Sequence, residues 1–316
     1  MTLLTAMVRS LLLVMVLAVV PAWAQSARVT ILLSEETAPY REVANAMVAD
    51  LATETRAGLE IQVVNLAESP NFDAGPKNTL IVTVGSAAAQ RASEFQSQTP
   101  VLATLIPRQS FEIIAAGSKG KQEQGRLAAL YLDQPVERQI ALVKAALPRG
   151  RSFGTLLGRH SLSLSGSIMA AAEKFQLKPV LLSIVSEDDL FQGLQQMVTE
   201  VDAIVAVPDN TIINRQTIRN FLLTTYRARI PVFGYAQSHV GAGVLAAVFS
   251  TPSQIGQQTG ELVRKIIKSH PIGLPSSGYP RYYTVKANYN VARSLNISVP
   301  DEESLRRESQ KSGEGD

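Results

Sequence analysis

Residue types that support catalysis are sparse in this sequence. The chain has no cysteine, and its three histidines lie far apart, at His160, His239 and His270. This spacing lacks the H-x-x-x-H pattern of zinc sites, and no G-x-S-x-G segment is present for a serine nucleophile. The segment Gly117–Lys121 fails as a phosphate-binding loop, because Ala115 and Gln122 stand where that motif requires glycine and Ser or Thr. We therefore expect no enzymatic activity, no metal ion and no cofactor.

Polar residues gather instead at the ends of predicted strands. Each comes just after an apolar or β-branched run, and the set comprises Ser34, Glu35, Gly85, Ser86, His160, Ser161, Asp209, Asn210, Tyr235 and Ser250. Ligands of parallel α/β sheets bind beyond the carboxyl ends of the strands. We therefore predict that these residues line a site for a small polar or zwitterionic ligand.

Three of these positions have a specific expected role, and each has a structural alternative. Asp209 is expected to pair with an amine, Ser86 and its neighbouring backbone N–H groups to hold a carboxylate, and Tyr235 to stack on a flat group. Alternatively, Ser86 and Asp209-Asn210 cap the helices that follow them, and Tyr235 packs in the interior. The sequence leaves both interpretations open.

The elements that must position these residues alternate along the chain. In the first half, helices are predicted at 40–55 and 87–95, and strands at 28–33, 59–66, 79–84, 101–106 and 111–116. In the second half, helices are predicted at 136–147, 165–175, from 187, and at 215–226, 255–267 and 289–295. The strands of this half are predicted at 152–157, 179–185, 203–207, 231–235, 244–249 and 282–286. The charged tail, 301–316, lacks apolar periodicity and is predicted to be disordered.

Alternating strands and helices predict parallel sheets covered by helices on both faces. We expect an α/β fold of two doubly wound parallel-sheet lobes joined by crossing hinge segments, with hinge candidates at 130–135, 249–252 and near Gly278. Residues 25–130 plus 250–278 are assigned to an N-terminal lobe, and residues 131–249 plus 279–300 to a C-terminal lobe. The cleft between two such lobes is the expected ligand site.

Composition and charge exclude several classes of protein. The 316 residues are 46% hydrophobic and 18% charged, which is typical of a globular chain rather than a disordered one. The 30 Lys plus Arg and 27 Asp plus Glu leave a net charge of +3, which is too small for a nucleic-acid-binding surface. We therefore expect no nucleic-acid partner.

The N-terminus predicts export. Arg9 precedes the apolar run Leu11–Val20, and Ala22 and Ala24 form an A-x-A cleavage pattern. A charged start, a short apolar region and small residues at the cut are typical of a cleavable signal peptide, here residues 1–24. A membrane anchor is the alternative, but the run is shorter than the roughly 20 residues that span a bilayer. We expect a periplasmic protein.

Three segments carry a resemblance to a known family: Ala129–Pro148, Val207–Tyr235 and Gly243–Ile267. They resemble the periplasmic substrate-binding proteins of ABC transporters with the type I fold, and in particular the tryptophan- and phenylalanine-binding subgroup. The resemblance implies a monomer that binds an amino acid or a similar solute between its lobes. It also implies an ABC permease and ATPase in the inner membrane as partners. In contrast to the family, residues 106–135 lack the D-P-V-x-A-G-type and P-G-G-N-x-T-G-like segments near the cleft.

Two other functions use the same fold or the same compartment. The first is a periplasmic ligand-sensing module that signals to a membrane receptor, and its cleft would be identical. A neighbouring permease and ATPase in the genome favour transport, whereas a neighbouring kinase or cyclase favours sensing. The second is a periplasmic hydrolase, which requires a nucleophile or metal cluster that the sequence does not provide.

Overall fold

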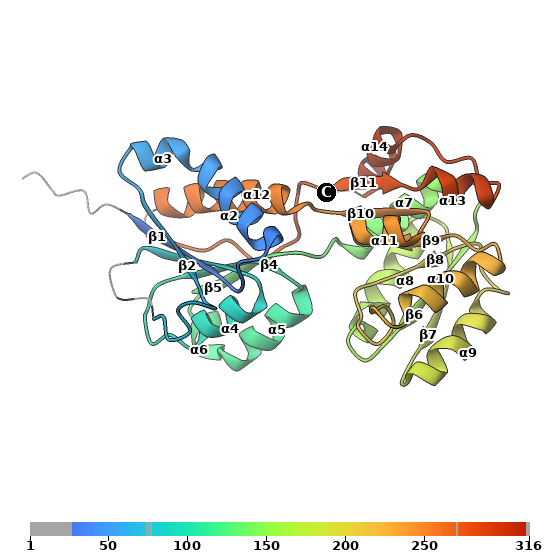
Figure 1. The fold of residues 1–316 in the computed structure, drawn as a ribbon, viewed down its shortest axis with the longest axis horizontal. Coiled ribbons are helices and arrows are strands. Elements are labelled where there is room, and N and C mark those ends of the chain that lie inside the picture. The colour runs from blue at the N-terminus through green and yellow to red at the C-terminus, as the bar shows by residue number, and fades with distance from the viewer. Residues whose placement is uncertain (1–26, 74, 76–77, 270, 314–316) are drawn as a thin grey trace, which may run out of the picture.

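The computed structural model describes residues 27–73, 75, 78–269 and 271–313, which form two α/β lobes at opposite ends of the long axis (Figure 1). The predicted signal peptide, residues 1–24, lies outside the described residues. Among the helices that the structure describes, none has the length and apolar character needed to cross a membrane. The two-lobed parallel α/β architecture confirms the predicted fold class.

The N-terminal lobe is built on a parallel sheet with the strand order β2-β1-β3-β4-β5. Its strands are β1 (Arg28–Leu33), β2 (Glu60–Asn65), β3 (Leu80–Val84), β4 (Val101–Ile106) and β5 (Leu127–Tyr131). One face is covered by α2 (Ala38–Asp50), α3 (Ala52–Arg56) and α12 (Pro252–Lys268), and the other by α4 (Ser86–Ser93), α5 (Arg108–Gly117) and α6 (Lys119–Glu123). Because helices cover both faces, the central strand β3 and the strand β5 are buried along their whole length.

The C-terminal lobe has the strand order β11-β10-β9-β8-β6-β7. Its strands are β6 (Ser152–Leu157), β7 (Lys178–Ser183), β8 (Ile204–Val205), β9 (Val232–Gly234), β10 (Ala246–Phe249) and β11 (Thr284–Ala287). Its helices are α7 (Val136–Ala146), the short 3₁₀ turn η1 (Leu162–Leu164), α8 (Ser165–Lys174), α9 (Glu187–Met197), α10 (Ile218–Arg227), α11 (Gln237–Ala242), α13 (Tyr289–Ser294) and α14 (Glu302–Gly313). The edge strand β11 pairs antiparallel with β10, because β10 runs toward the N-terminal lobe and the chain returns from that lobe into β11.

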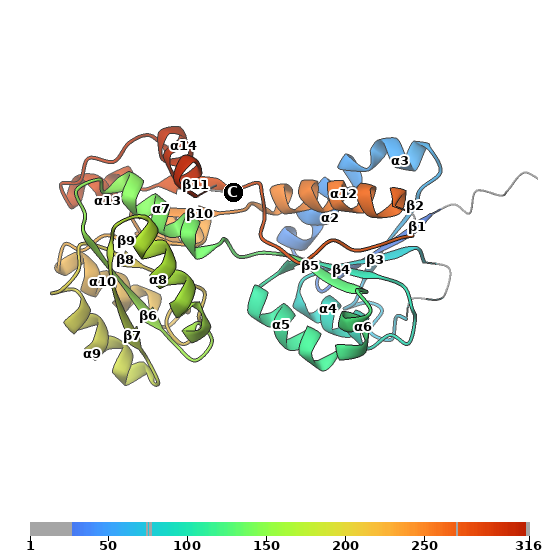
Figure 2. The same ribbon diagram turned by 180° about the vertical axis from the view of Figure 1, so that it is seen from behind.

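The chain crosses between the lobes at three places within the described residues (Figure 2). The first crossing joins β5 to α7, the second joins β10 to α12, and the third follows α12 and leads to β11. Before the third crossing, the returning chain runs beside β5, where Gly278 N–H donates to Ala129 O over 2.9 Å and Gly278 O accepts from Tyr131 N–H over 2.9 Å. The predicted hinge candidates therefore fall on or next to these crossings.

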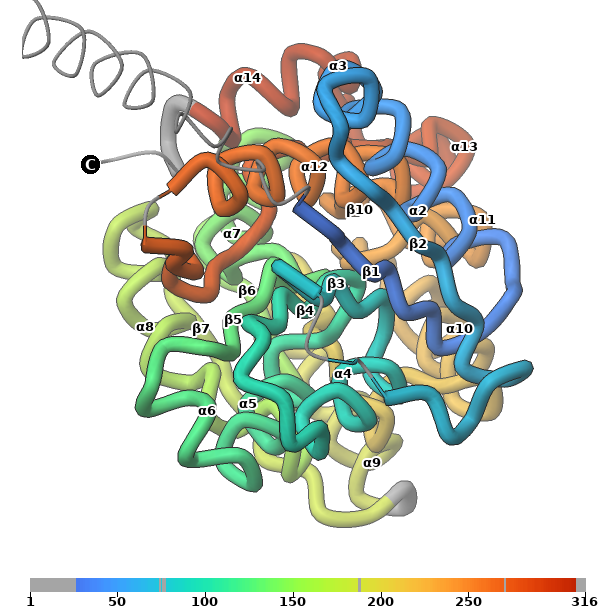
Figure 3. The backbone as a smooth tube through the Cα atoms, turned by 90° about the vertical axis from the view of Figure 1, so that its left-hand side faces the viewer, coloured from blue at the N-terminus to red at the C-terminus, as the bar shows by residue number. Residues whose placement is uncertain are grey.

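Helix α12 lies beside α2 although about 200 residues separate them in sequence (Figure 3). Glycines permit this close approach, since a Cβ at Gly256 would lie 2.3 Å from Val43 O. Arg264 then donates to the carboxylates of Asp50 and Glu54, over 2.8 Å in each case. A helix that follows the C-terminal sheet in sequence is thereby docked on the N-terminal lobe.

For residues 106–131, one prediction is wrong and one strand is missing from the prediction. The apolar run at 111–116 is helical, in α5, with Phe111, Ile114 and Ala115 buried on one face. That set has the i, i+3, i+4 spacing of a helix, and a short continuous apolar run does not separate a strand from a buried helix. The strand β5 is absent from the prediction, which assigns 127–130 to no element and places a hinge candidate at 130–135.

The prediction of a disordered tail is also wrong for the described part of 301–316. Residues Glu302–Gly313 form α14, which packs against α7 and β11, and Leu305 and Ser309 are fully buried there. Asp301 accepts from Ser304 N–H over 2.9 Å, and Glu302 forms an ion pair with Lys286 over 2.9 Å. A single buried leucine gives no periodic pattern, so tertiary packing rather than sequence amphipathicity fixes this helix.

We expect Leu305→Ala to lower the free energy of unfolding by about 2–5 kcal/mol, because it opens a cavity in a fully buried site. Urea denaturation followed by circular dichroism measures the change. Arg307→Ala, on the exposed side of the same helix, is the control and should change stability by less than about 0.5 kcal/mol. Equal midpoints for both variants would show that α14 is not docked in solution.

Candidate functional site

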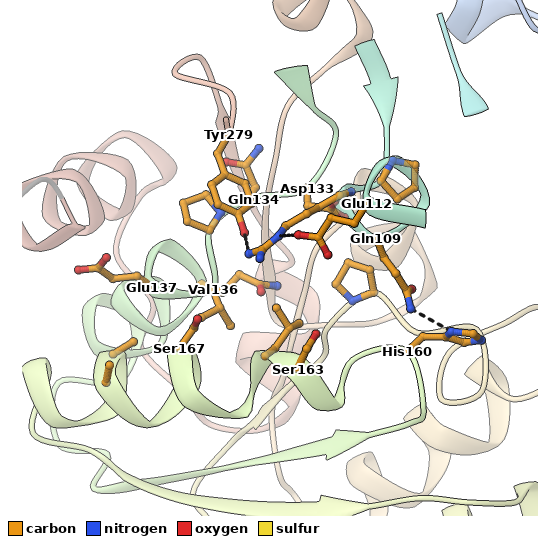
Figure 4. Close-up of a pocket in the computed structure, with 18 of the residues that line it drawn as sticks. Gln109, Glu112, Asp133, Gln134, Val136, Glu137, His160, Ser163, Ser167 and Tyr279 are labelled. Carbon is orange, nitrogen blue, oxygen red and sulfur yellow. Dashed lines mark hydrogen bonds and ion pairs between the residues drawn. The ribbon is translucent and has the colours of Figure 1, made fainter. Parts of the chain in front are cut away.

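Two adjoining cavities occupy the space between the lobes. The Tyr235 cavity has a volume of about 580 Å³ and is lined by Tyr235, Asp209, Asn210, Ser250 and further residues of both lobes. The Tyr279 cavity has a volume of about 470 Å³ and is lined by Tyr279, Arg108, Glu112, α7 and α8 (Figure 4). Six residues line both cavities and make them parts of one cleft: Pro107, Gln109, Asp133, Gln134, His160 and Pro208.

The cleft lies at the carboxyl ends of strands from both sheets. In the N-terminal lobe, Pro107 follows β4 directly, and Asp133 lies two residues beyond β5. In the C-terminal lobe, His160 follows β6, Pro208 follows β8, and Tyr235 follows β9. Side chains from five strands therefore meet here, because parallel strands direct their carboxyl ends to the same edge of a sheet.

The carboxylate of Asp209 is held by four donors of its own lobe. Its Oδ2 accepts from His160 N–H over 3.2 Å, from Ser161 N–H over 2.9 Å and from the Ser161 hydroxyl over 2.8 Å. Its Oδ1 accepts from Thr211 N–H over 2.9 Å. Asp209 is 4% exposed and fixes the loops after β6 and β8 to each other. Ser161 is 1% exposed beneath it and does not line either cavity.

Tyr235 forms an apolar wall of its cavity and lies in a negative field. Its ring packs edge-on against the imidazole of His239, with centroids 4.4 Å apart and an interplanar angle of 82°. Burial, followed by the charges of Asp209 and Asp133, raises the pKa of Tyr235 to about 12. The phenol is therefore a neutral hydrogen-bonding and packing group at physiological pH.

A direct contact joins the two lobes across the cleft. The Gln109 amide Nε2 lies 3.0 Å from His160 Nδ1, and the amide donates to the ring nitrogen (Figure 4). Gln109 belongs to the first turn of α5, whereas His160 lies in the loop after β6. Since both residues line both cavities, this bridge stands at the junction between them.

Ser250 lines the cleft and also links the crossing segments through its hydrogen bonds. Its Oγ accepts from the Gln134 amide over 2.8 Å and donates to Tyr282 O over 2.6 Å. Arg138 in turn donates to Gln134 Oε1 over 2.6 Å and to Pro280 O over 2.9 Å. These bonds connect all of the crossings that lie in the described part of the chain.

The structure places the remaining predicted residues outside the lining of both cavities. Ser34 Oγ accepts from Ala88 N–H over 2.9 Å, so it occupies a position at the start of α4 where a ligand carboxylate was expected. Gly85 has φ 92° there, and a Cβ on it would lie 2.7 Å from Ser34 Oγ. Ser86 is half-buried in the first turn of α4, and Glu35 is exposed. Of the predicted set, His160, Asp209, Asn210, Tyr235 and Ser250 are brought together at the cleft.

Several cleft residues were not predicted. Asp133 follows β5 and would have met the strand-end criterion if that strand had been recognised. Gln109 and Arg108 begin α5, which was taken for a strand. Arg108 pairs with Glu112 over 2.6 Å and donates to the Tyr279 hydroxyl over 2.9 Å. Within the described ranges, no group of three or more His, Asp or Glu side chains is placed to hold a metal ion.

Residues 64–310 match the model of a protein family described as ABC transporter substrate binding protein. This chain belongs to that family. The family is one of substrate-binding proteins and is not an enzyme class. Among curated proteins, none matches the sequence.

Solved structures with the same fold belong to several bacteria. An ABC domain in complex with L-Trp from Streptococcus pneumonia is 21% identical, with a TM-score of 0.59, and the match covers 90% of this chain and 98% of that one. A conserved domain protein from Vibrio cholerae is 21% identical, with a TM-score of 0.58 and coverages of 89% and 98%. A ligand-free, open substrate-binding protein with adhesive properties from Clostridium difficile is 17% identical, with a TM-score of 0.68 and coverages of 88% and 97%. These likenesses show the type I fold of this ABC substrate-binding protein.

We expect Asp209→Asn to destabilise this substrate-binding protein by about 1–3 kcal/mol, because an amide presents one acceptor oxygen to four donors and turns its own N–H groups toward some of them. Chemical denaturation measures the loss. Asn210→Ala, at the exposed neighbouring position, is the control and should shift stability by less than about 0.5 kcal/mol. If Asp209→Asn were as stable as the wild type, this carboxylate would have no structural role.

The pKa of Tyr235 predicts a loss of stability in strong alkali. A folded-state pKa of about 12, above the ordinary value of 10.0, means that the folded protein holds the phenol proton more tightly than the unfolded chain does. This contribution to stability is complete below pH 10 and is lost as the pH rises from 10 toward 12. Denaturation of the wild type and Tyr235→Phe across that range should show a smaller decline in the variant. Parallel declines would contradict the assignment.

Proposed function

We propose that the protein is the solute-binding component of an ABC importer and binds a small polar or zwitterionic ligand, such as an amino acid, between its lobes. The observation that carries this proposal is the Tyr235 cavity, whose wall is formed by both lobes and by the crossing segments between them. Its volume of about 580 Å³ lies in the range of small-molecule sites. The L-Trp complex of the Streptococcus pneumonia relative supports a ligand of this size.

The mechanism that we propose is binding followed by lobe closure. A ligand that contacts one wall of the cleft brings the other wall toward it, and the crossing segments absorb the rotation. The joined crossings at Gln134 and Ser250 favour a rotation of whole lobes about one axis rather than independent loop motions. Only a ligand that contacts both walls of the cleft gains affinity when the lobes close. The closed conformation is therefore populated mainly when a solute is bound.

The transport role fixes the partners and the compartment. We propose that the closed protein is recognised by an ABC permease and its ATPase in the inner membrane. Export through the signal peptide predicted at residues 1–24 would deliver the protein to the periplasm as a monomer. Solutes that cross the outer membrane would reach the cleft there.

A thermal-shift screen of the purified protein tests this function. The panel contains amino acids, small peptides, sugars, nucleosides and aromatic acids. A ligand at 100 times its dissociation constant should add about 2.7 kcal/mol of stability and raise Tm by a few degrees. Small-angle scattering with the same ligand should show a smaller radius of gyration than without it. A panel in which no compound stabilises the protein would contradict a solute-binding role for these classes.

A further inference from the structure

The cations that line the cleft already have anionic partners. Lys174 forms an ion pair with Glu137 over 2.5 Å at the foot of the Tyr279 cavity. Arg108 pairs with Glu112 over 2.6 Å, and its Nη1 donates to the Tyr279 hydroxyl over 2.9 Å (Figure 4). Both cations of the described lining are therefore already paired with a glutamate, so a ligand carboxylate or phosphate would meet no unpaired Lys or Arg there.

The carboxylates of the cleft are in a different state. Asp209 accepts four hydrogen bonds but forms no ion pair with any Lys or Arg that the structure describes. Asp133 is the side chain with the least compensation, because it accepts from the backbone N–H of Arg108 and no side chain in the described part of the chain donates to it. Burial raises the pKa of Asp133, and this effect exceeds the opposing effects of the Arg108 charge and the backbone N–H groups. Within the described residues, no Lys or Arg forms an ion pair with Asp133, so its negative charge is only partly compensated, by the Arg108 charge and by backbone N–H groups.

Asp133 is also at the centre of the cleft. It lies on the first crossing segment, two residues after β5, and it lines both cavities. Its charge and that of Asp209 both act on Tyr235 and disfavour ionisation of that phenol. The two carboxylates therefore set up a negative potential in the same space, from the crossing segment and from the C-terminal lobe.

We propose that the ligand carries an ammonium group and that Asp133 is its counter-charge, so that the cleft accepts cations and zwitterions and rejects anions. This inference rests on the solute-binding function proposed above and names the chemistry of its ligand. An ammonium group offers three N–H donors to an oxygen that has few protein donors, whereas an anion meets two carboxylates and no unpaired cation. The neutral polar side chains of Gln237 and Ser238 also line this cavity and can hydrogen-bond the rest of the ligand.

Matched ligands that differ only in charge test this proposal. The first set is phenethylamine, phenylalanine and hydrocinnamate, and the second is isoamylamine, leucine and isocaproate. Thermal shift and titration calorimetry with the purified protein should detect binding of the amine or the amino acid in at least one set. The acid of that set should bind at least about tenfold more weakly, since one hydrogen-bonded charge pair is worth this factor or more.

Two carboxylate-to-amide variants locate the counter-charge. Asp133→Asn keeps an oxygen acceptor for Arg108 N–H, so α5 retains its cap while the charge is removed. We expect this variant to melt as a folded protein and to bind the amine at least about tenfold more weakly. Asp202→Asn is the matched control, because Asp202 also accepts from backbone N–H groups but lies at the amino ends of the strands, away from the cleft. It should bind the amine with unchanged affinity.

The outcomes separate this inference from the function on which it rests. An acid that binds as well as its amine, unchanged affinity in Asp133→Asn, or a failure of every amine and amino acid to bind overturns the ammonium proposal. A sugar or nucleoside found by the broader screen would then keep the solute-binding role with a different ligand chemistry. Silence in both experiments would overturn the two proposals together.

Discussion

The hydrogen bonds among Gln134, Ser250 and Tyr282 tie together the segments that pass between the lobes, and the geometry of the cleft depends on them. Without this link, each crossing would be an independent loop, and the two walls of the cleft would lack a common axis. Arg138 extends the link to Pro280, so that side chains satisfy backbone carbonyls where no sheet is present to do so. This hydrogen-bonded link between the crossing segments is polar, and Gln134 and Ser250 are buried in it. Each of its side chains needs its partner, because a buried polar group without one would be unsatisfied.

The two aspartates of the cleft differ in how the protein satisfies their carboxylates. Asp209 is surrounded by donors and fixes two loops of the C-terminal lobe, so its carboxylate is part of the frame. Asp133 caps α5 but keeps most of its hydrogen-bonding capacity unused. Two aspartates in one cavity thus have different surroundings: one carboxylate stabilises the protein, and the other is left for a ligand. Unpaired buried charge costs stability, which is a cost that proteins bear at functional sites.

Much of the fold could be predicted from the sequence, because strongly apolar strands alternate with amphipathic helices over most of the chain. The errors fall where local pattern and tertiary context disagree. Phe111 and Ile114 lie in a run too short to distinguish a helix from a strand. Leu305 is the single apolar side chain that the last helix buries, and a single apolar residue has no periodicity. The strand-end rule brought His160, Asp209 and Tyr235 to one cleft, but it depended on recognising every strand, and the unrecognised β5 concealed Asp133. The use of Ser34 Oγ by Ala88 N–H could not be predicted, because it depends on a contact between residues 54 positions apart.

The antiparallel pairing of β11 with β10 has a consequence for how the chain acquires its shape. The edge of β10 stays open until the chain has left for the N-terminal lobe, formed α12 on α2 and returned. Neither lobe is contiguous in sequence. The N-terminal lobe is complete only when α12 is present, and the C-terminal lobe only when β11 is present. Such long-range closure is slow compared with the formation of local contacts. A chain made from its N-terminus therefore cannot complete its C-terminal sheet until β11, which lies within the last tenth or so of the sequence, has been synthesised.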